Sequence, residues 1–376
     1  MAWYLPDDKL AELDPRTPLH LQGVVLPEGH TRDLFIKDGH VVLEADGAVT
    51  VARDGFILPG LVDSHCHISL GKGGAIPDEQ SRHHAELDRD AGALLLREVG
   101  APNDTHWVDS EIDLPRMIRA GRHIARPKRY IRGYAVEIEP EDLAAEVEIQ
   151  AKRGDGWVKL VGDWIDRSEG DLLPLWPEEA ARAGIERAHE LGVRITAHCF
   201  GEESVAQLVR LGIDGIEHGT GLDESTAKIM AEHQTSLVPT LTNIDNFVLF
   251  AAQGMPKYPK YSQRISRLYK RRMETFARAV ELGVPIYAGT DAGGTVPHGL
   301  INREIRQLAL VGGAEFALGA ASWRAREWLG ESGRLIPGAH ADLIVYNSDP
   351  REHLWTLDHP GLMILKGKVR PQGHRA

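Results

Sequence analysis

The sequence predicts an α/β fold, a (β/α)8 TIM barrel with a small composite β-sandwich built from the N- and C-terminal segments. Two observations support this prediction. Short apolar strands alternate with helical patterns through the middle of the chain, which is the order expected of a parallel barrel. Short β-like pieces stand at both ends of the chain, where they can pair into one small sheet structure. A length of 376 residues is enough for both parts.

The terminal β-like pieces lie within residues 19–52 and 341–370, and Gly, Asp and Pro separate them. We therefore expect residues 1–55 and 335–376 to form the β-sandwich domain, and residues 56–334 to form the catalytic barrel.

Eight candidate strands fill the middle of the chain, and helical patterns such as 175–192 and 224–234 separate most of them. The eight candidates are 60–68, 92–100, 129–136, 156–162, 193–200, 212–219, 235–241 and 284–291.

Composition excludes several classes of function. The formal net charge of −12, from 55 acidic and 43 basic residues, argues against a nucleic-acid binder, which needs a basic surface. The N-terminal segment "MAWYLPDDKL" carries acids where a signal peptide needs basic residues, and no apolar run is long enough to span a membrane. We expect a cytoplasmic protein with a small-molecule substrate, no membrane partner, and homo-oligomerisation as an open question.

The first candidate strand ends in "DSHCH", with two histidines separated by one residue. Side chains alternate across a strand, so His65 and His67 are expected on one face, together with Asp63. Two imidazoles that point the same way can bind a metal ion. The alternative is a pair of half-exposed strand histidines.

Other candidate strands also end in residues that can bind a metal ion. Active groups of a barrel gather at the C-terminal ends of its strands. These ends add Lys159, His198, His218 and Asp291 to the histidine pair. Each histidine alone could be a hydrogen-bonded core residue, and Asp291 in "TDAGG" could be a turn or helix cap.

Lys159 lies in "GWVKLV", where apolar neighbours make an unpaired ammonium costly. A deprotonated lysine can react with carbon dioxide to give a carbamate, an anionic group able to bridge two metal ions. The alternative is a lysine paired with Asp63 or Asp291.

Taken in order, "PGLVDSHCH", "WVKLV", "ITAHCFG", "GIDGIEHGT", "LVPTL", "AGTDAG" and "GRLIPGAHADLIVYNSDP" resemble the amidohydrolase superfamily. The resemblance is to its dinuclear branch, which includes imidazolonepropionase-like and prolidase-like proteins, and it covers nearly the whole chain. It implies one metal ion held by His65, His67 and Asp291, a second held by His198 and His218, and N6-carboxylysine at Lys159 between them. The two divalent ions are expected to be zinc, although manganese and iron also suit these ligands.

The chain departs from prolidase-like relatives at two places. Such relatives commonly carry a glycine- and histidine-containing loop after strand three, where we place "GYAVEIEPEDLAAEVE". A tyrosine frequently follows their strand-five histidine by two residues, and here that residue is Phe200. Both places are expected to contact substrate, so dipeptide specificity does not carry over.

The expected function is metal-dependent hydrolysis of an amide, peptide-like or cyclic amide C–N bond of a small molecule. A metal-bridging hydroxide would attack, and Asp291 would act as general base and then general acid. Phe200 and His298 are candidate substrate contacts. One alternative is a mononuclear deaminase or imidazolone-type ring hydrolase, and another is a non-catalytic barrel scaffold.

Overall fold

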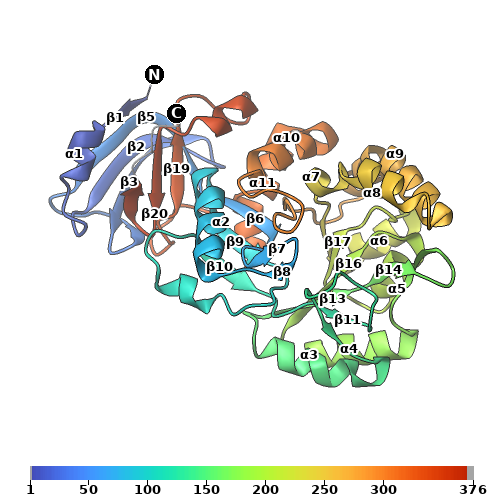
Figure 1. Cartoon of the computed structure of the whole chain (residues 1–376). Helices are drawn as coiled ribbons and strands as arrows, with labels where there is room; N and C mark the ends of the chain where they lie inside the picture. Colours follow the sequence, from blue (N-terminus) through green and yellow to red (C-terminus); the bar gives the residue numbers. More distant parts are fainter. Residues whose placement is uncertain (1, 371–376) are drawn as a thin grey trace.

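The computed structural model describes residues 2–370; Met1 and residues 371–376, the end of the predicted sandwich segment, lie outside the described residues. Strands from both ends of the chain form one eight-stranded sheet, here called the terminal sheet. Figure 1 shows its blue N-terminal and red C-terminal strands side by side at one end of the molecule. The spatial order is β21-β20-β19-β5-β2-β3-β4, with β1 paired to β5. The strands are β1 (Trp3–Tyr4), β2 (Leu19–Val25), β3 (His30–Lys37), β4 (His40–Val42), β5 (Val49–Pro59), β19 (Leu343–Tyr346), β20 (Leu362–Leu365) and β21 (Lys368–Arg370).

In the terminal sheet β2 has one buried face, whereas β19 and β20 are buried on both faces. In β2, Leu19 and Leu21 are buried while the intervening His20 and Gln22 are partly exposed, as expected of a strand with one face on a core. Leu21 belongs to a buried cluster that also includes Leu343 from the other end of the chain. The two ends of the sequence therefore share one core.

The middle of the chain forms parallel strands whose pairing follows a TIM-barrel-like plan. One parallel sheet has the order β10-β9-β6, and a second has the order β12-β11-β13-β16-β17-β18. The strands are β6 (Leu61–Cys66), β9 (Ala93–Glu98), β10 (Arg116–Arg119), β11 (Ile124–Ala125), β12 (Val136–Glu137), β13 (Trp157–Val161), β16 (Arg194–Cys199), β17 (Gly215–His218) and β18 (Ser236–Val238).

The third strand was predicted in the wrong place. Residues 129–136 form mostly turns, and the chain passes between β9 and β13 earlier, as β10 and β11. "RYIRGYAV" alternates in the manner of a strand, but its tyrosines pack near His123 and His198 instead of in a ladder. The segment between β10 and β11 contains a glycine and a histidine, Gly121 and His123.

The predicted eighth strand, 284–291, is not a regular strand. It nevertheless lies between β18 and β6 and bridges to both. Leu237 bridges Ile286 on one side, and Cys66 bridges Ala292 on the other, both in parallel. The backbone N–H of Asp291 also donates to the carbonyl of His65 at 2.7 Å. This contact places Asp291 beside the end of β6.

Helices cover the outside of these strands and lie over the end opposite the terminal sheet (Figure 1). α4 shows why such segments are helical: it begins after Pro177, carries two glutamates in its first turn and basic residues in its last, and so complements the helix dipole. The helices are α1 (Asp7–Ala11), α2 (Asp78–Asp90), α3 (Leu143–Ala151), α4 (Glu178–Glu190), α5 (Glu202–Arg210), α6 (Glu224–His233), α7 (Leu241–Ile244), α8 (Phe247–Gly254), α9 (Pro259–Glu281), α10 (Ile301–Gly312), α11 (Ala314–Ala320) and α12 (Trp323–Trp328).

Short elements complete the chain. Two hairpins pair β7 (Leu70–Gly71) with β8 (Gly74–Ala75) and β14 (Asp163–Asp166) with β15 (Asp171–Pro174), and three 3-10 turns span His106–Ser110, Pro140–Asp142 and Leu354–Asp358. Within residues 2–370, no helix is long and apolar enough to cross a membrane.

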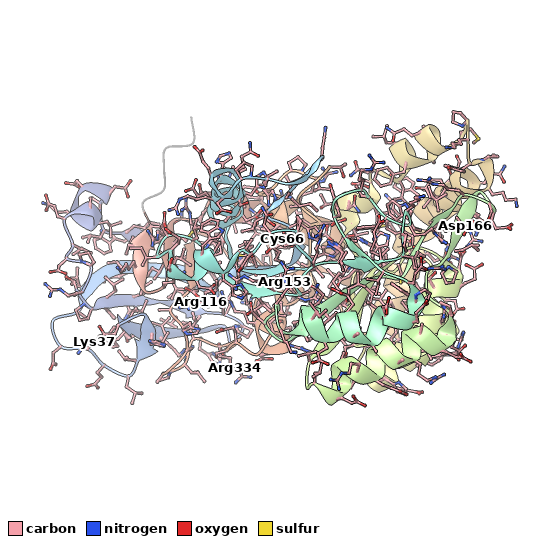
Figure 2. The ribbon with its side chains drawn as sticks, turned by 60° about the horizontal axis from the view of Figure 1, so that its bottom comes forward. Lys37, Cys66, Arg116, Arg153, Asp166 and Arg334 are labelled. Atoms are coloured by element: carbon pink, nitrogen blue, oxygen red, sulfur yellow. The ribbon has the colours of Figure 1, made fainter. Side chains whose placement is uncertain are left out.

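Figure 2 places Cys66 in the middle of the molecule, between Lys37 near the end that holds the terminal sheet and Asp166 at the opposite end. Cys66 and Cys199, the two cysteines of the chain, are buried and free.

Gly289 allows the segment before Asp291 to approach β6 and β18 closely. A Cβ at this position would lie 2.6 Å from Val238 Cγ1 and 2.7 Å from His65 Cβ.

Gly289→Ala is therefore expected to lower the free energy of unfolding by about 1–3 kcal/mol, because neither neighbour can move freely. Urea denaturation would measure this change. The control is Gly73→Ala, where a Cβ meets nothing within 4 Å; equal midpoints for the two variants would contradict the close approach.

Candidate metal centre

His65, His67 and Asp291 meet at the C-terminal end of β6. His65 Nε2 lies 3.2 Å from His67 Nε2 and 3.1 Å from Asp291 Oδ1, and His67 Nε2 lies 3.2 Å from the same oxygen. All three residues were predicted to act together, and the structure brings them into contact.

The hydrogen-bond partners of the two Nδ1 atoms determine which nitrogen of each imidazole carries the proton. His65 Nδ1 lies 2.8 Å from Glu217 Oε2, and His67 Nδ1 lies 2.8 Å from the carbonyl of Gly100. A carboxylate and a carbonyl accept hydrogen bonds, so both Nδ1 atoms donate. In the neutral rings both Nε2 atoms are then acceptors, and they face each other and a carboxylate oxygen. Three acceptors therefore converge, the two Nε2 atoms and Asp291 Oδ1.

His218 and His198 continue the cluster from β17 and β16. Their rings lie 4.6 Å apart, and the ring of His218 lies 5.2 Å from that of His65. His218 Nδ1 is 2.7 Å from Thr240 Oγ1, whereas the buried His198 Nε2 has no hydrogen-bond partner among the described residues. Burial lowers the pKa of His218 to about 3, so its ring is neutral at pH 7.

Lys159 points into the interior from β13 and is buried. Its Nζ has no hydrogen-bond partner among residues 2–370, so the predicted alternative of a direct pair with Asp63 or Asp291 is not observed. Burial lowers the pKa of Lys159 to about 8, although the charges of Glu217 and Asp291 act in the opposite direction. A neutral amine is therefore accessible near physiological pH.

Asp291 is fixed by its neighbours. Burial opposes its ionisation, but His65 and His67 hold the pKa of Asp291 well below its usual range. Asn243, from α7, donates to Asp291 Oδ2 at 2.7 Å. The backbone is left-handed at Asp291, with φ of 59°, and at His218, with φ of 69°, a conformation that few residues with a Cβ adopt.

Glu217 is a central residue that the sequence analysis did not single out. Besides His65, its carboxylate accepts hydrogen bonds from Arg97 Nη1 at 2.9 Å and from Thr196 Oγ1 at 2.6 Å. It lies next to His218 in "GIEHG", and its position before a strand-end histidine is the only sequence signal it gives. Glu217 orients His65 and balances the buried charge of Arg97.

His123 also belongs to the cluster and was missed because strand three was misplaced. Its ring lies 5.1 Å from that of His67, and its buried Nδ1 has no partner among the described residues. Gly100 makes room for it, since a Cβ there would lie 2.5 Å from His123 Nδ1. Burial, with the charges of His67 and Lys159, keeps the pKa of His123 well below 6.5.

Asp63 supports the centre from beneath it. Its Oδ1 accepts from the backbone N–H groups of His65 and Thr290, and its Oδ2 accepts from Thr290 Oγ1 at 2.6 Å. These contacts tie β6 to the segment that carries Asp291. Asp63 thus acts as an orienting group.

A cavity of about 410 Å³ opens above the centre, within the size range of small-molecule sites. His67, His198 and Asp291 form part of its wall. The rest of the wall is largely aromatic, with Tyr130, Tyr134, Trp164, Phe250, Tyr258 and Tyr261.

The two predicted substrate contacts lie in different surroundings. Phe200 lines the cavity and packs edge-on against His198, with ring centres 4.4 Å apart. His298 is not among the described residues that line it. Instead, His298 Nδ1 bonds to Asp88 Oδ2 at 2.7 Å, and its ring stacks on His84.

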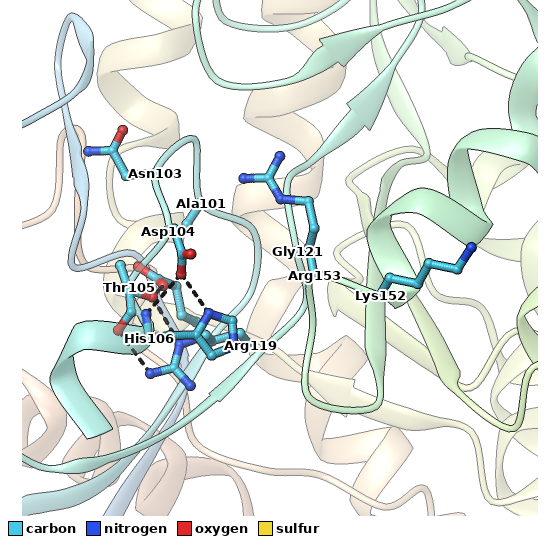
Figure 3. A pocket seen from close by; sticks show the side chains of 10 residues that line it. Ala101, Asn103, Asp104, Thr105, His106, Arg119, Gly121, Lys152 and Arg153 are labelled. Atoms are coloured by element: carbon cyan, nitrogen blue, oxygen red, sulfur yellow. Dashed lines mark hydrogen bonds and ion pairs between the residues drawn. The ribbon is translucent and has the colours of Figure 1, made fainter. Parts of the chain in front are cut away.

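A second, smaller cavity of about 160 Å³ lies beside β10 (Figure 3). Several of its polar side chains are held by ion pairs or hydrogen bonds. Arg119 binds Asp109 at 2.8 Å and Asp155 at 2.9 Å, and Thr105 Oγ1 donates to Glu98 at 2.5 Å. Hydrogen bonds and ion pairs of this kind hold the fold together locally. The aromatic cavity is therefore the candidate active site.

The residues of the centre fit a divalent cation. Ligand atoms of His65, His218 and Asp291 lie within 4.8 Å of one another. Imidazole nitrogens and a carboxylate are suitable ligands for zinc and related ions. A cation would also satisfy the acceptors that face each other and the unpartnered nitrogen of His198.

Comparison with known proteins agrees with this geometry. The sequence profile of the amidohydrolase family matches residues 173–370. An uncharacterised protein of Mycobacterium tuberculosis is 52% identical over 93% of this chain and 95% of its own length. An imidazolonepropionase of Chromobacterium violaceum is 26% identical over 96% of this chain and 94% of its own length.

A solved structure shares the fold. A prolidase complexed with N-methylphosphonate-L-proline superposes with a TM-score of 0.81 and 22% identity, and the match covers 95% of this chain and 100% of that chain. The resemblance drawn from the sequence motifs is confirmed, and proteins of this family typically bind metal ions. The chain belongs to the amidohydrolase family and is a hydrolase that acts on carbon–nitrogen bonds.

Proposed function

We propose that this protein is a metal-dependent amidohydrolase that hydrolyses an amide, peptide-like or cyclic amide bond of a small molecule. The observation that carries the proposal is the convergence of His65 Nε2, His67 Nε2 and Asp291 Oδ1 within 3.2 Å of one another, at the floor of a cavity of substrate size. Acceptors gathered in this way need a cation, and the cavity gives a substrate access to it.

Two divalent ions, which we propose to be zinc, would be held by two groups of residues. His65, His67 and Asp291 would hold one ion, and His198 and His218 the other, with carboxylated Lys159 between them. When bound, such ions act as Lewis acids and lower the pKa of water. Glu217 and Asp63 would keep His65 and the Asp291 segment in position.

Lys159 is suited to carbamate formation. Its lowered pKa makes the neutral amine available, and that amine can attack the carbon of carbon dioxide. The new C–N bond forms as one proton leaves the nitrogen, and the product is an anionic carbamate. The Nζ atom, which has no partner among the described residues, would then carry two oxygens that could bind metal ions.

Asp291 would move the proton of the reaction. Among the described residues that line the cavity, it is the one that carries a carboxylate, and its lowered pKa keeps it ionised at pH 7. It would accept a proton from the attacking water and return it to the nitrogen of the leaving amine. Asn243, bonded to Oδ2, would hold the carboxylate in place for both transfers.

A one-ion enzyme is the second candidate, and one observation favours it. The group of ligand atoms within 4.8 Å contains His65, His218 and Asp291, which is enough for a single ion. A mononuclear deaminase or imidazolone-type ring hydrolase would use that set and leave Lys159 without a metal role.

We also propose that the division of the chain near residues 55 and 335 separates a catalytic (β/α)8 barrel from a β-sandwich. A separate buried cluster on one face of the terminal sheet, which includes Leu21 and Leu343, supports this division. The other face of that sheet packs against the parallel strands, because Leu58 and Ile344 belong to their buried cluster. A cytoplasmic location, a small-molecule substrate and a homo-oligomer stay predictions.

Asp291→Asn is expected to keep the fold and to lower kcat at least about 100-fold, because an amide cannot accept the proton. The measurement is amide hydrolysis by the metal-loaded protein, with circular dichroism to check folding. Asp46→Asn, an exposed site, is the matched control. Unchanged turnover in the Asp291 variant would remove the proposed role.

Lys159→Ala is expected to lose metal and activity, because the bridging anion is gone. Plasma mass spectrometry should find about two metal ions per chain in the parent protein and fewer in the variant. A short carboxylic acid should restore part of both metal content and activity. About one ion per chain in both proteins, with no effect of the acid, would favour the one-ion enzyme.

Lys159→Met is expected to stabilise the metal-free protein in a pH-dependent way. The pKa of Lys159 is lowered from 10.5 to about 8, so the folded state disfavours its charge by about 3 kcal/mol. The full penalty applies below pH 8, and it fades as the pH rises toward 10.5. Urea denaturation across this range would measure the difference from the parent protein. Lys37→Met, at an exposed strand position (Figure 2), is the control; a constant difference between pH 8 and 10 would contradict the lowered pKa.

A further inference from the structure

The cavity above the candidate metal centre carries almost no charge of its own. Among the described residues that line it there is no lysine and no arginine, and Asp291 is the one acidic side chain. Ile131 and Ile165 add aliphatic surface to the aromatic wall. Phenylalanine at position 200 also leaves that part of the wall without a hydroxyl group.

Two arginines near the cavity, Arg129 and Arg264, are engaged elsewhere. Arg129 precedes the lining residue Tyr130, but it binds Asp166 at 2.8 Å and the carbonyl of Trp164 at 3.2 Å. Arg264, one turn after Tyr261 on α9, binds Glu203 at 2.6 Å and Asp171 at 3.1 Å. Neither guanidinium is free to pair with a substrate carboxylate.

The aromatic wall is built as a packed surface. The rings of Tyr130 and Trp164 meet edge-on with centres 4.8 Å apart, and Tyr130 also contacts the ring of His198 at 5.6 Å. The wall therefore reaches down to the predicted metal ligands. Stacked and edge-on rings favour an apolar or aromatic group on the ligand.

We propose that the substrate is an uncharged molecule with an aromatic or bulky apolar group next to the scissile C–N bond, and that the cavity discriminates against substrates that carry a carboxylate. The inference rests on the proposed function and narrows its substrate class. A carboxylate that lies against the aromatic wall loses water and gains no cationic side chain there. An apolar ring, in contrast, gains from leaving water.

The test compares ligands that differ by one carboxylate. N-(phenylsulfonyl)pyrrolidine and N-(phenylsulfonyl)-L-proline resist hydrolysis, so isothermal titration calorimetry on the metal-loaded protein measures binding alone. We expect the neutral ligand to bind at least about tenfold more tightly. Equal or tighter binding of the acid, or binding of neither ligand, would overturn the inference.

A cation at the mouth of the cavity should offset this preference. Gln253 lines the cavity from α8 and is exposed, so Gln253→Arg places a guanidinium there without burying it. The variant should bind the acidic ligand about tenfold more tightly than the parent protein does. Gln263→Arg makes the same change at an exposed position on α9 outside this cavity, and it should leave both affinities unchanged. Equal effects of the two variants would contradict a local cause.

Hydrolysis assays distinguish failure of this inference from failure of the proposed function. N-(phenylacetyl)pyrrolidine and N-(phenylacetyl)-L-proline form the corresponding amide pair, and the neutral member should have the higher kcat/KM. Hydrolysis of both with preference for the acid would retain the proposed function and overturn the inference. Selective binding of the neutral sulfonamide, with no hydrolysis of either amide, would retain the cavity preference and count against the proposed function.

Discussion

The rest of the centre depends on the buried carboxylate of Glu217. From β17 it bonds to His65 on β6, Arg97 on β9 and Thr196 on β16, so one side chain links four strands. It fixes the proton of His65 on Nδ1 and leaves Nε2 free to bind a cation. It also balances Arg97, whose guanidinium lies 3.9 Å from the ring centre of Trp157. Without Glu217, the buried guanidinium of Arg97 would lose its carboxylate partner, a loss that costs several kcal/mol.

Much of the centre could be predicted from the sequence, because strand ends carry a clear signal. Apolar runs that end in His, Lys or Asp place those residues near the C-terminal edge of a parallel sheet, and His65, His198 and His218 do lie at the ends of their strands. Lys159 lies in the middle of β13, and Asp291 follows a segment that is not a regular strand. The third strand could not be located in the same way. β10 and β11 are short, whereas the neighbouring "RYIRGYAV" alternates over a longer stretch. The side chains of this segment line the cavity, and its backbone does not pair in a sheet. Hydrophobic periodicity cannot distinguish these two arrangements.

Glu217 shows a different reason why sequence analysis falls short. Adjacent residues of a strand point to opposite faces, so His218 and Glu217 could not both be assigned to the interior by alternation. The left-handed backbone at His218 breaks that rule and turns its ring back toward His65. Such a conformation at a residue other than glycine is set by tertiary contacts, and here Thr240 holds the ring. His123 was missed for a related reason, since its position became visible only once the course of strand three was known.

The same left-handed residues also bear on how the protein could change over time. His218 and Asp291 each hold a backbone conformation that costs on the order of 1–3 kcal/mol for a residue with a Cβ. Glycine would remove most of that cost at either position, and it would also remove a proposed metal ligand. Selection for thermal stability alone would therefore favour loss of the centre, and a hyperstable descendant of this chain would be expected to lack catalysis. Retention of both residues in a lineage is thus a sign that its members are still under selection as enzymes.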